Sequence, residues 1–224
     1  MRRGIIRGCS KIIMSQKTLS IGMATYDDFD GVFFSVQSLR MFHEICNTDE
    51  VEFIILDGNT NSEHGKCCKG FIEDKLKQKY IPYFGKLSSF NKYETIKYAE
   101  GKYVLIIDCH VLIQKNGIAK LLEYFENNKN CKDLLQGPLI QDHLSRVYTH
   151  FDKVWRGDMY GIWATDQESY ERGEPFEIPM RSDVIFLKIA FIRKNCHCIA
   201  KLLPPRFRIL FGKSSLRRMN EHFR

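Results

Sequence analysis

The tripeptide Asp108-Cys109-His110 has the residue types and the spacing of a metal site. It follows the apolar run Tyr103–Ile107, and an Asp and a His two residues apart at a strand end can both turn toward one ion. Carboxylate oxygen together with imidazole nitrogen suits Mn²⁺ or another borderline metal, and Mg²⁺ is also compatible. Such an ion would neutralise and hold a diphosphate leaving group as a Lewis acid. Cys109, between the two ligands, is expected to point the other way, into the core.

Acidic residues follow two further apolar runs. Asp27 and Asp28 come after Leu19–Ala24, and Asp57 comes directly after Val51–Leu56. A single Asp in such a place is often only a helix cap. Acids after all three runs indicate instead that one edge of a sheet gathers charge for a ligand.

Strands and helices that alternate along the chain would position these residues. Apolar runs predict buried strands, helical spacing of apolar residues predicts helices, and Pro82 indicates a short edge strand. The expected strands are 19–24, 51–56, 81–84 and 103–107, and the expected helices are 32–44, 71–80, 90–99 and 117–127. This order predicts an α/β fold with a mostly parallel sheet and helices on both faces. Ligands of such sheets bind beyond the carboxyl ends of the strands.

The composition is that of a globular chain with one main domain. It has 224 residues, of which 44% are hydrophobic and 27% charged. No apolar run approaches the roughly 20 residues of a membrane-spanning helix. The eight cysteines include no Cys-x-x-Cys pair. The apolar stretches near the N-terminus are too short for a secretory signal, so we expect reduced thiols and a cytoplasmic location. Residues 1–18 are expected to be a disordered leader.

The C-terminal segment is strongly basic. Residues 181–224 contain eleven Lys and Arg but only two acids, Asp183 and Glu221. Few aromatic residues are interleaved, which argues against a nucleic-acid partner. The segment could make a weak peripheral contact with an anionic membrane, or it could be a basic tail without a partner.

The chain from about Leu19 to Met180 resembles glycosyltransferase family 2, of the GT-A type. The likeness rests on Ser20–Tyr26 as a first-strand segment, Ile55–Thr60 as a second-strand motif, and Ala99–His110 as a Gly-x-Tyr strand that leads to an Asp-x-His metal motif. Segments 133–139, 149–157 and 161–166 look like one branch of that family. The resemblance implies a GT-A-like, Rossmann-like three-layer sandwich over 19–180 that binds a nucleotide sugar.

The resemblance also implies roles for individual residues. Thr25, Tyr26 and Asp28 would line the nucleotide, and Asp57 would accept from the base imide of a uridine-type donor. Lys92 stands where the family usually has an Arg near the diphosphate. Asp108 and His110 would hold the metal. Trp155 and Trp163 would stack on a sugar, although ordinary core aromatics are an equal alternative.

Two other histidines could carry chemistry. His150, beside Thr149, could be a third metal ligand, although a hydrogen-bonded structural role is the more frequent one. His43, at a helix end next to Glu44, is expected to be either solvated or simply a residue at the helix C-terminus.

The chain departs from the family after Met180. The family continues with an acidic segment that supplies the general base, whereas 181–218 contains no acid except Asp183. Residues 181–219 are therefore either out of frame between two indels or truly divergent. The remaining base candidates are Asp158, Asp166 and Glu177, because an inverting transfer needs a carboxylate near the acceptor hydroxyl.

The sequence thus predicts metal-dependent transfer of a hexose-type group from a nucleotide-diphosphate sugar to a hydroxyl of a glycan, protein or lipid acceptor. The first alternative is a catalytically impaired or vestigial protein that binds the nucleotide sugar. The second is a nucleotidyltransferase, a class that usually has a Gly-rich basic loop after its first strand, where this chain has the acidic segment 25–31.

Overall fold

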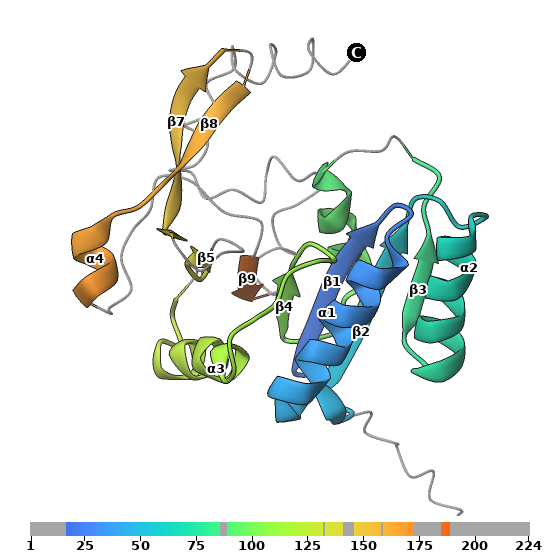
Figure 1. Cartoon of the computed structure of the whole chain (residues 1–224). Helices are drawn as coiled ribbons and strands as arrows, with labels where there is room; N and C mark the ends of the chain where they lie inside the picture. The colour runs from blue at the N-terminus through green and yellow to red at the C-terminus, as the bar shows by residue number, and fades with distance from the viewer. Residues whose placement is uncertain are drawn as a thin grey trace, which may run out of the picture.

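The core of the protein is a five-stranded sheet in the order β3-β2-β1-β4-β9 (Figure 1). The computed structural model describes residues 17–85, 89–131, 133–140, 146–157, 159–172 and 185–188. The strands are β1 (Leu19–Thr25), β2 (Val51–Asp57), β3 (Lys79–Pro82), β4 (Tyr103–Ile106) and β9 (Ile185–Lys188). The first four run parallel, and β9 runs antiparallel to β4. The prediction of a mostly parallel α/β sheet is confirmed.

The register of the sheet places β1 at its centre. Leu19 pairs with Val51 of β2 on one side and with Tyr103 of β4 on the other. The chain builds outward from β1 through β2 to β3, and then crosses back to add β4 on the opposite side. The point between β1 and β4 is therefore a topological switch point, and its carboxyl edge is where ligands bind in open α/β sheets.

Helices cover both faces of the sheet, because successive side chains of a strand point to opposite faces. On one face pack α1 (Phe29–Phe42), α2 (Glu63–Lys69) with its π-helical continuation η2 (Gly70–Lys75), and α3 (Gly117–Asn127). Their core residues join Tyr103 and Leu105 of β4. On the other face, the 3-10 helix η3 (Ser89–Tyr98) packs against Val104 and Ile106. A three-layer sandwich results, as predicted.

Three elements differ in position from the sequence expectation. Helix α1 begins at Phe29, three residues earlier than expected, because Asp28 caps it. The helix expected at 71–80 lies at 63–75, where the Ser62 side chain accepts from Gly65 N–H and starts it. Lys77 then adopts a left-handed φ of 55°, so the chain turns and β3 begins at Lys79 rather than at residue 81.

The chain after α3 forms two small antiparallel sheets. In one, β5 (Leu139–Ile140) pairs with β6 (Val147–Tyr148). In the other, β7 (His150–Arg156) pairs with β8 (Met159–Ala164), and α4 (Gln167–Arg172) follows. Figure 1 shows the β7–β8 hairpin extending away from the five-stranded sheet. Within the described part of the chain, no helix is both long and apolar enough to cross a membrane.

Strand β9 lies in the segment that departs from the family pattern. Its Lys188 Nζ donates to the carbonyl oxygen of Lys129 at 2.9 Å and lies 4.8 Å from the ring centroid of Phe125. These contacts tie β9 to α3 and to the turn after it. Residues 185–188 are therefore part of the central sheet, whatever the origin of the segment around them.

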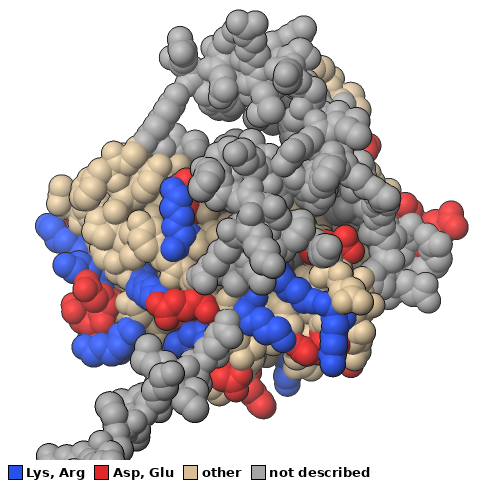
Figure 2. All heavy atoms as spheres, turned by 180° about the vertical axis from the view of Figure 1, so that it is seen from behind, with Lys and Arg blue, Asp and Glu red and all other residues tan. Residues whose placement is uncertain are grey.

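The charges of the described residues are mixed on the face opposite to that of Figure 1. Figure 2 shows Lys and Arg side chains alternating with Asp and Glu across its lower half. Oppositely charged neighbours largely cancel beyond a Debye length, about 8 Å at physiological ionic strength. On this view the described surface carries no single-sign field of the kind that binds a nucleic-acid backbone.

Candidate functional site

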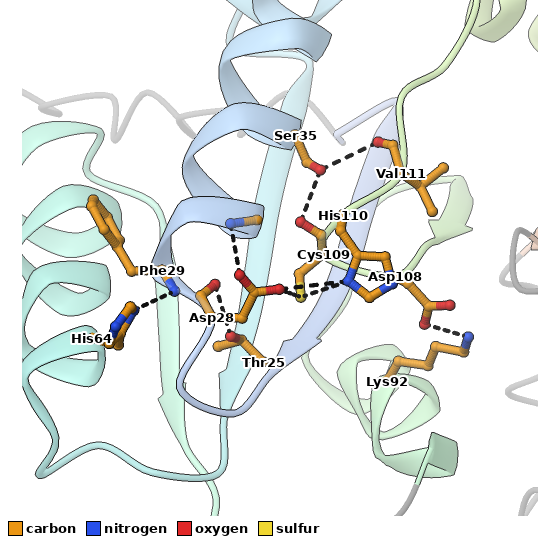
Figure 3. Close-up of polar contacts among 11 residues, drawn as sticks. Thr25, Asp28, Phe29, Ser35, His64, Lys92, Asp108, Cys109, His110 and Val111 are labelled. Atoms are coloured by element: carbon orange, nitrogen blue, oxygen red, sulfur yellow. Dashed lines mark hydrogen bonds and ion pairs between the residues drawn. The ribbon is translucent and has the colours of Figure 1, made fainter. Parts of the chain in front are cut away.

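The loop after β1 places Asp28 at the start of α1, at the switch point of the sheet. Asp28 Oδ1 accepts from Gly31 N–H at 2.9 Å, which caps the helix, and Thr25 Oγ1 donates to the Asp28 carbonyl oxygen at 3.2 Å. Gly31 is needed here, because a Cβ at this position would collide with the Asp28 carboxylate. The cap fixes the carboxylate and leaves Oδ2 directed at the loop that follows β4 (Figure 3).

Asp28, Cys109 and His110 bring three potential ligand atoms together at this point (Figure 3). Cys109 Sγ lies 3.3 Å from Asp28 Oδ2 and 3.9 Å from His110 Nδ1. His110 Nδ1 lies 3.5 Å from Asp28 Oδ2. We call these three residues the ligand triangle. It has a buried side, formed by Cys109, and an open side, because the His110 side chain is 70% exposed.

The ligand triangle shifts the acidity of its members. Burial raises the pKa of the Cys109 thiol to about 12, and the neighbouring Asp28 carboxylate contributes to that rise. Partial burial pushes the pKa of Asp28 up, but hydrogen bonds from Gly31 N–H, Cys109 and His110 outweigh it, and the pKa is lowered. At neutral pH without a cation, the site therefore contains a carboxylate next to a protonated thiol.

Asp108 does not face His110 in this structure. Its Oδ1 accepts from Lys92 Nζ of η3 at 2.6 Å, and the Lys92 side chain is only 4% exposed. Strand β4 ends at Ile106, and the chain turns at Cys109 and His110, so alternation no longer puts residues two apart on one side. Figure 3 shows Asp108 and His110 pointing to different partners. Their joint binding of one ion remains a prediction.

Cys109 is buried in the main core cluster, as expected. Its thiol nevertheless approaches both Asp28 and His110, instead of pointing away from the ligands. The turn after β4 is again the reason, because it rotates the Cys109 side chain beneath the capped end of α1.

Helix α1 also holds the loop that carries Cys109 and His110. The buried Ser35 hydroxyl donates to the carbonyl oxygen of Cys109 at 2.9 Å and lies 3.3 Å from that of Val111. His43 Nε2 lies 3.3 Å from the carbonyl oxygen of Ile113. His43 is buried, so the solvated alternative is wrong, whereas its position at the C-terminal end of α1 is confirmed. Burial lowers the pKa of His43, while its bond to Ile113 acts in the opposite direction.

Asp57 lies at the end of β2, where the sequence placed it. It is 1% exposed, Oδ1 accepts from Asn59 N–H at 2.8 Å, and Oδ2 accepts from the Tyr80 hydroxyl at 2.7 Å. Asn59 Nδ2 in turn donates to Asp27 Oδ2 at 2.9 Å, which joins the loops after β1 and β2. Asp57 thus fixes the turn after β2, and a contact with a nucleotide base remains a prediction.

The exposed residues beside these loops include Tyr26 and His64. The Tyr26 side chain is exposed next to the capped start of α1. His64 Nδ1, on α2, accepts from Phe29 N–H at 3.2 Å, which leaves Nε2 as the protonated nitrogen of the neutral ring. No local sequence pattern indicates a role for His64, because its partner is the first residue of a helix 35 positions earlier.

The remaining predicted residues belong to the hairpin region or lie outside the described residues. Trp155 on β7 is exposed, and Trp163 on β8 is partly buried against Tyr148, with ring centroids 5.9 Å apart. The backbone N–H of Asp166 donates to Thr149 Oγ1 at 2.9 Å. Two of the predicted bases lie outside the described residues: Asp158 and Glu177.

His150 takes part in a local network at the start of β7. Its Nε2 lies 3.0 Å from Asp152 Oδ1, and its Nδ1 lies 2.9 Å from Thr149 Oγ1. Both ring nitrogens therefore have partners within the hairpin region, as the structural alternative for this residue expects.

Comparisons with known proteins give a limited likeness to glycosyltransferases. No family model matches the chain, and no curated protein matches its sequence. Among matching solved structures is a mannosyltransferase from Pyrobaculum calidifontis, in complex with GDP-Man and Mn²⁺, with 11% identity, a TM-score of 0.42, and coverage of 50% of this chain and 33% of that one.

Two structures of S. aureus TarS also match. One has 18% identity and a TM-score of 0.41, and covers 50% of this chain and 20% of that one. The other, of residues 1–349 in complex with UDP-GlcNAc, has 17% identity and a TM-score of 0.42, and covers 52% of this chain and 33% of that one. The chain spans a third or less of the length of these proteins. At this level of similarity, function has to be argued from the residues of the site.

Proposed function

We propose that the chain binds a nucleotide-diphosphate sugar at the carboxyl edge of its sheet and transfers the sugar to an acceptor hydroxyl. The observation that carries the proposal is the convergence of three loops at the switch point between β1 and β4. These loops supply the capped Asp28, the buried Asp57 with its turn, and Asp108 with His110. Ligands of open α/β sheets bind at this place.

The nucleotide would lie over the loops after β1 and β2. Thr25 and Tyr26 are at the end of β1, with Tyr26 exposed and its ring free of the core. The hydrogen bond between Asn59 and Asp27 joins the two loops into one surface. In this proposal Asp57 orients the turn that contacts the base, and a uridine-type base follows from the family resemblance.

The diphosphate would lie over the loop after β4. A divalent ion, Mn²⁺ or Mg²⁺, would neutralise the diphosphate and stabilise it as a leaving group. The donor chemistry suits a cation, because the His110 imidazole is open to solvent and the carboxylate of Asp28 lies 3.5 Å from it. His110 is the ligand that sequence and geometry both support, with Asp108 as the carboxylate from the sequence. Lys92 orients Asp108 and adds positive charge beside it.

We assign the residues that would contact the acceptor and the sugar from the part of the chain after β6. The general base would be Asp158, Asp166 or Glu177, and the sugar-stacking residues would be Trp155 and Trp163, all in or after the hairpin. The acceptor, a glycan, protein or lipid hydroxyl, would approach from that side, and the basic C-terminal segment could guide it to an anionic surface. We place this activity in the cytoplasm.

A thermal-shift screen tests donor binding directly. UDP, GDP and other nucleoside diphosphates are added to the full chain with and without Mn²⁺. We expect UDP together with Mn²⁺ to raise the melting temperature of the protein. The rise should be smaller in Asp108→Asn. No shift with any nucleotide would refute the proposal.

A turnover assay separates the enzyme from a protein that only binds the donor. The scarcity of acids between 181 and 218 favours the second candidate, a catalytically impaired nucleotide-sugar-binding protein. Release of UDP from UDP-sugars in the presence of Mn²⁺, lost in Asp108→Asn, would support the transferase. A nucleotide-induced shift without any release would support the binding protein.

A further inference from the structure

The thiol of Cys109 makes the ligand triangle chemically different from a site built of carboxylates alone. Cys109 Sγ, Asp28 Oδ2 and His110 Nδ1 are contributed by two loops that flank the switch point. We propose that these three atoms bind a thiophilic divalent cation of the Zn²⁺ class in preference to Mg²⁺. The proposal rests on the proposed function only for its biological use, and not for the existence of the site.

The dimensions of the ligand triangle fit tetrahedral Zn²⁺. With Zn–S of about 2.3 Å and Zn–N and Zn–O of about 2.1 Å, ideal tetrahedral angles give S···O and S···N edges of about 3.6 Å and an N···O edge of about 3.4 Å. The corresponding distances here are 3.3, 3.9 and 3.5 Å. Each edge agrees within about 0.3 Å, which small side-chain rotations can remove.

Mg²⁺ fits the same triangle less well than Zn²⁺. Octahedral coordination at about 2.1 Å requires adjacent ligand atoms about 3 Å apart. The edge from His110 to Asp28, 3.5 Å, and the edge from Cys109 to His110, 3.9 Å, exceed this value by more than the roughly 0.3 Å by which the triangle departs from tetrahedral Zn²⁺. Mg²⁺ also prefers oxygen ligands and keeps several waters, whereas thiolate and imidazole select Zn²⁺ and similar ions. Geometry and ligand chemistry therefore favour the same class of cation.

Binding requires that the thiol lose its proton. The S–H bond of Cys109 breaks, the sulfur lone pair forms the bond to the cation, and one proton leaves to solvent for each ion bound. Without an ion the thiol is protonated and donates to Asp28 Oδ2. The cation then replaces that proton between the same two atoms, so little of the surrounding structure has to move.

The surroundings hold two of the ligands in place. Asp28 is fixed by its bond to Gly31 N–H, and the Cys109 backbone is fixed by Ser35 of α1. Three protein ligands leave the fourth tetrahedral position open, as in catalytic rather than structural zinc sites. The exposed His110 marks the open side, where a water molecule or an oxygen of a diphosphate could complete the coordination.

Equilibrium dialysis of the reduced, metal-free full chain against Zn²⁺, with metal analysis, tests the proposal. The background carries Cys196→Ser and Cys198→Ser, which removes the thiols of the Cys196-His197-Cys198 segment. We expect one Zn²⁺ per chain, retained in a large excess of Mg²⁺. Cobalt substituted into the same site should show a thiolate-to-metal charge-transfer band.

Three variants assign the ligands. His110→Ala removes an exposed ring, and Cys109→Ser replaces the thiol with a hydroxyl of similar shape. Each is expected to weaken binding by more than the 10–100-fold typical of losing an outer-shell partner. The matched control is Cys67→Ser, because Cys67 is an exposed thiol outside the triangle. It should leave Zn²⁺ affinity unchanged.

The outcomes separate this site from the proposed function. Zn²⁺ binding that is unchanged in both His110→Ala and Cys109→Ser, or that Mg²⁺ displaces at equal concentration, overturns the proposal. Cobalt binding without a charge-transfer band excludes Cys109 as a ligand. Nucleotide-induced thermal shifts with Mn²⁺ but no Zn²⁺ binding would overturn this inference and leave the proposed function standing. Zn²⁺ binding at the triangle without any nucleotide-induced shift would support this inference and overturn the proposed function.

Discussion

Removing the carboxylate of Asp108 should destabilise the fold, because it takes a negative partner from a buried lysine. Lys92 Nζ and Asp108 Oδ1 are 2.6 Å apart, and their side chains are 4% and 29% exposed. At an effective dielectric constant of about 20, two unit charges at this distance attract by about 6 kcal/mol before desolvation is subtracted. Removing one member of a buried pair typically costs about 3–5 kcal/mol, so we expect this range to be the upper limit of the stability that Asp108→Ala loses.

A double-mutant cycle measures the interaction itself. Urea unfolding, followed by far-UV circular dichroism in the presence of a chelator, is recorded for Asp108→Ala, Lys92→Met and the double variant. We expect a coupling energy of about 1–3 kcal/mol, with the double variant more stable than Asp108→Ala alone. Asp108→Asn should lose less stability than Asp108→Ala, because its amide oxygen can still accept from Lys92.

The pair Lys66–Glu63 is the matched control for this cycle. Its charged atoms are 2.7 Å apart, nearly the same separation, but both side chains are exposed. Solvent screening should make its coupling much smaller than that of Lys92 and Asp108. Equal coupling in the two cycles, or a coupling below about 0.5 kcal/mol for the buried pair, would refute the reasoning from burial.

Three further predictions concern the scaffold of the site. Ser35→Ala removes the donor that holds the loop after β4 and should cost about 1–3 kcal/mol in urea unfolding, whereas Ser38→Ala on the same helix should cost less. Burial lowers the pKa of His43, so the stability it contributes is present above the ordinary value of 6.5 and is lost as pH falls below it. His43→Gln should make the free energy of unfolding less dependent on pH below 6.5. An unchanged pH dependence would contradict the burial of a neutral ring. Glu52 is buried, which raises its pKa, but the bond from Lys79 and other donors outweigh this and lower the pKa. Its stabilisation is lost only as pH falls below the ordinary 4.5, so Glu52→Gln should remove part of the acid-induced unfolding slope and leave the slope near neutral pH unchanged.

The strands at the centre of the fold could be predicted because their local pattern and their tertiary role agree. The strands predicted at 19–24, 51–56 and 103–107 are mostly apolar, with Ser20 and Glu52 as the polar exceptions, and the parallel sheet buries both of their faces. Helix α3 was predicted at its observed bounds because its apolar residues recur at helical spacing. The helix after β2 begins eight residues before its predicted start, because Gly65 and the pair Cys67-Cys68 show no clear apolar periodicity and the Ser62 cap determines where the helix begins.

The composition of the site could be predicted better than its pairing. Asp28, Asp57, Asp108 and His110 all lie at the carboxyl edge, because parallel strands end on the same side of a sheet. Which of them face each other depends on the turn after β4, and no local pattern determines the direction of that turn. The bond between Asp57 and Tyr80 likewise joins residues 23 positions apart, so only the assembled sheet reveals it.

Helix α1 contributes to both sides of the ligand triangle. Its first turn fixes Asp28 through Gly31, and its middle and end hold the loop of Cys109 and His110 through Ser35 and His43. A tilt of α1 would therefore carry the Asp28 carboxylate and the Cys109 backbone in the same direction. A shared displacement leaves the distance between these two ligands unchanged. It does change their distance from Lys92, which lies on η3 at the other face of the sheet. We therefore expect the distance between Asp28 and Cys109 to fluctuate less than the distance from either residue to Lys92.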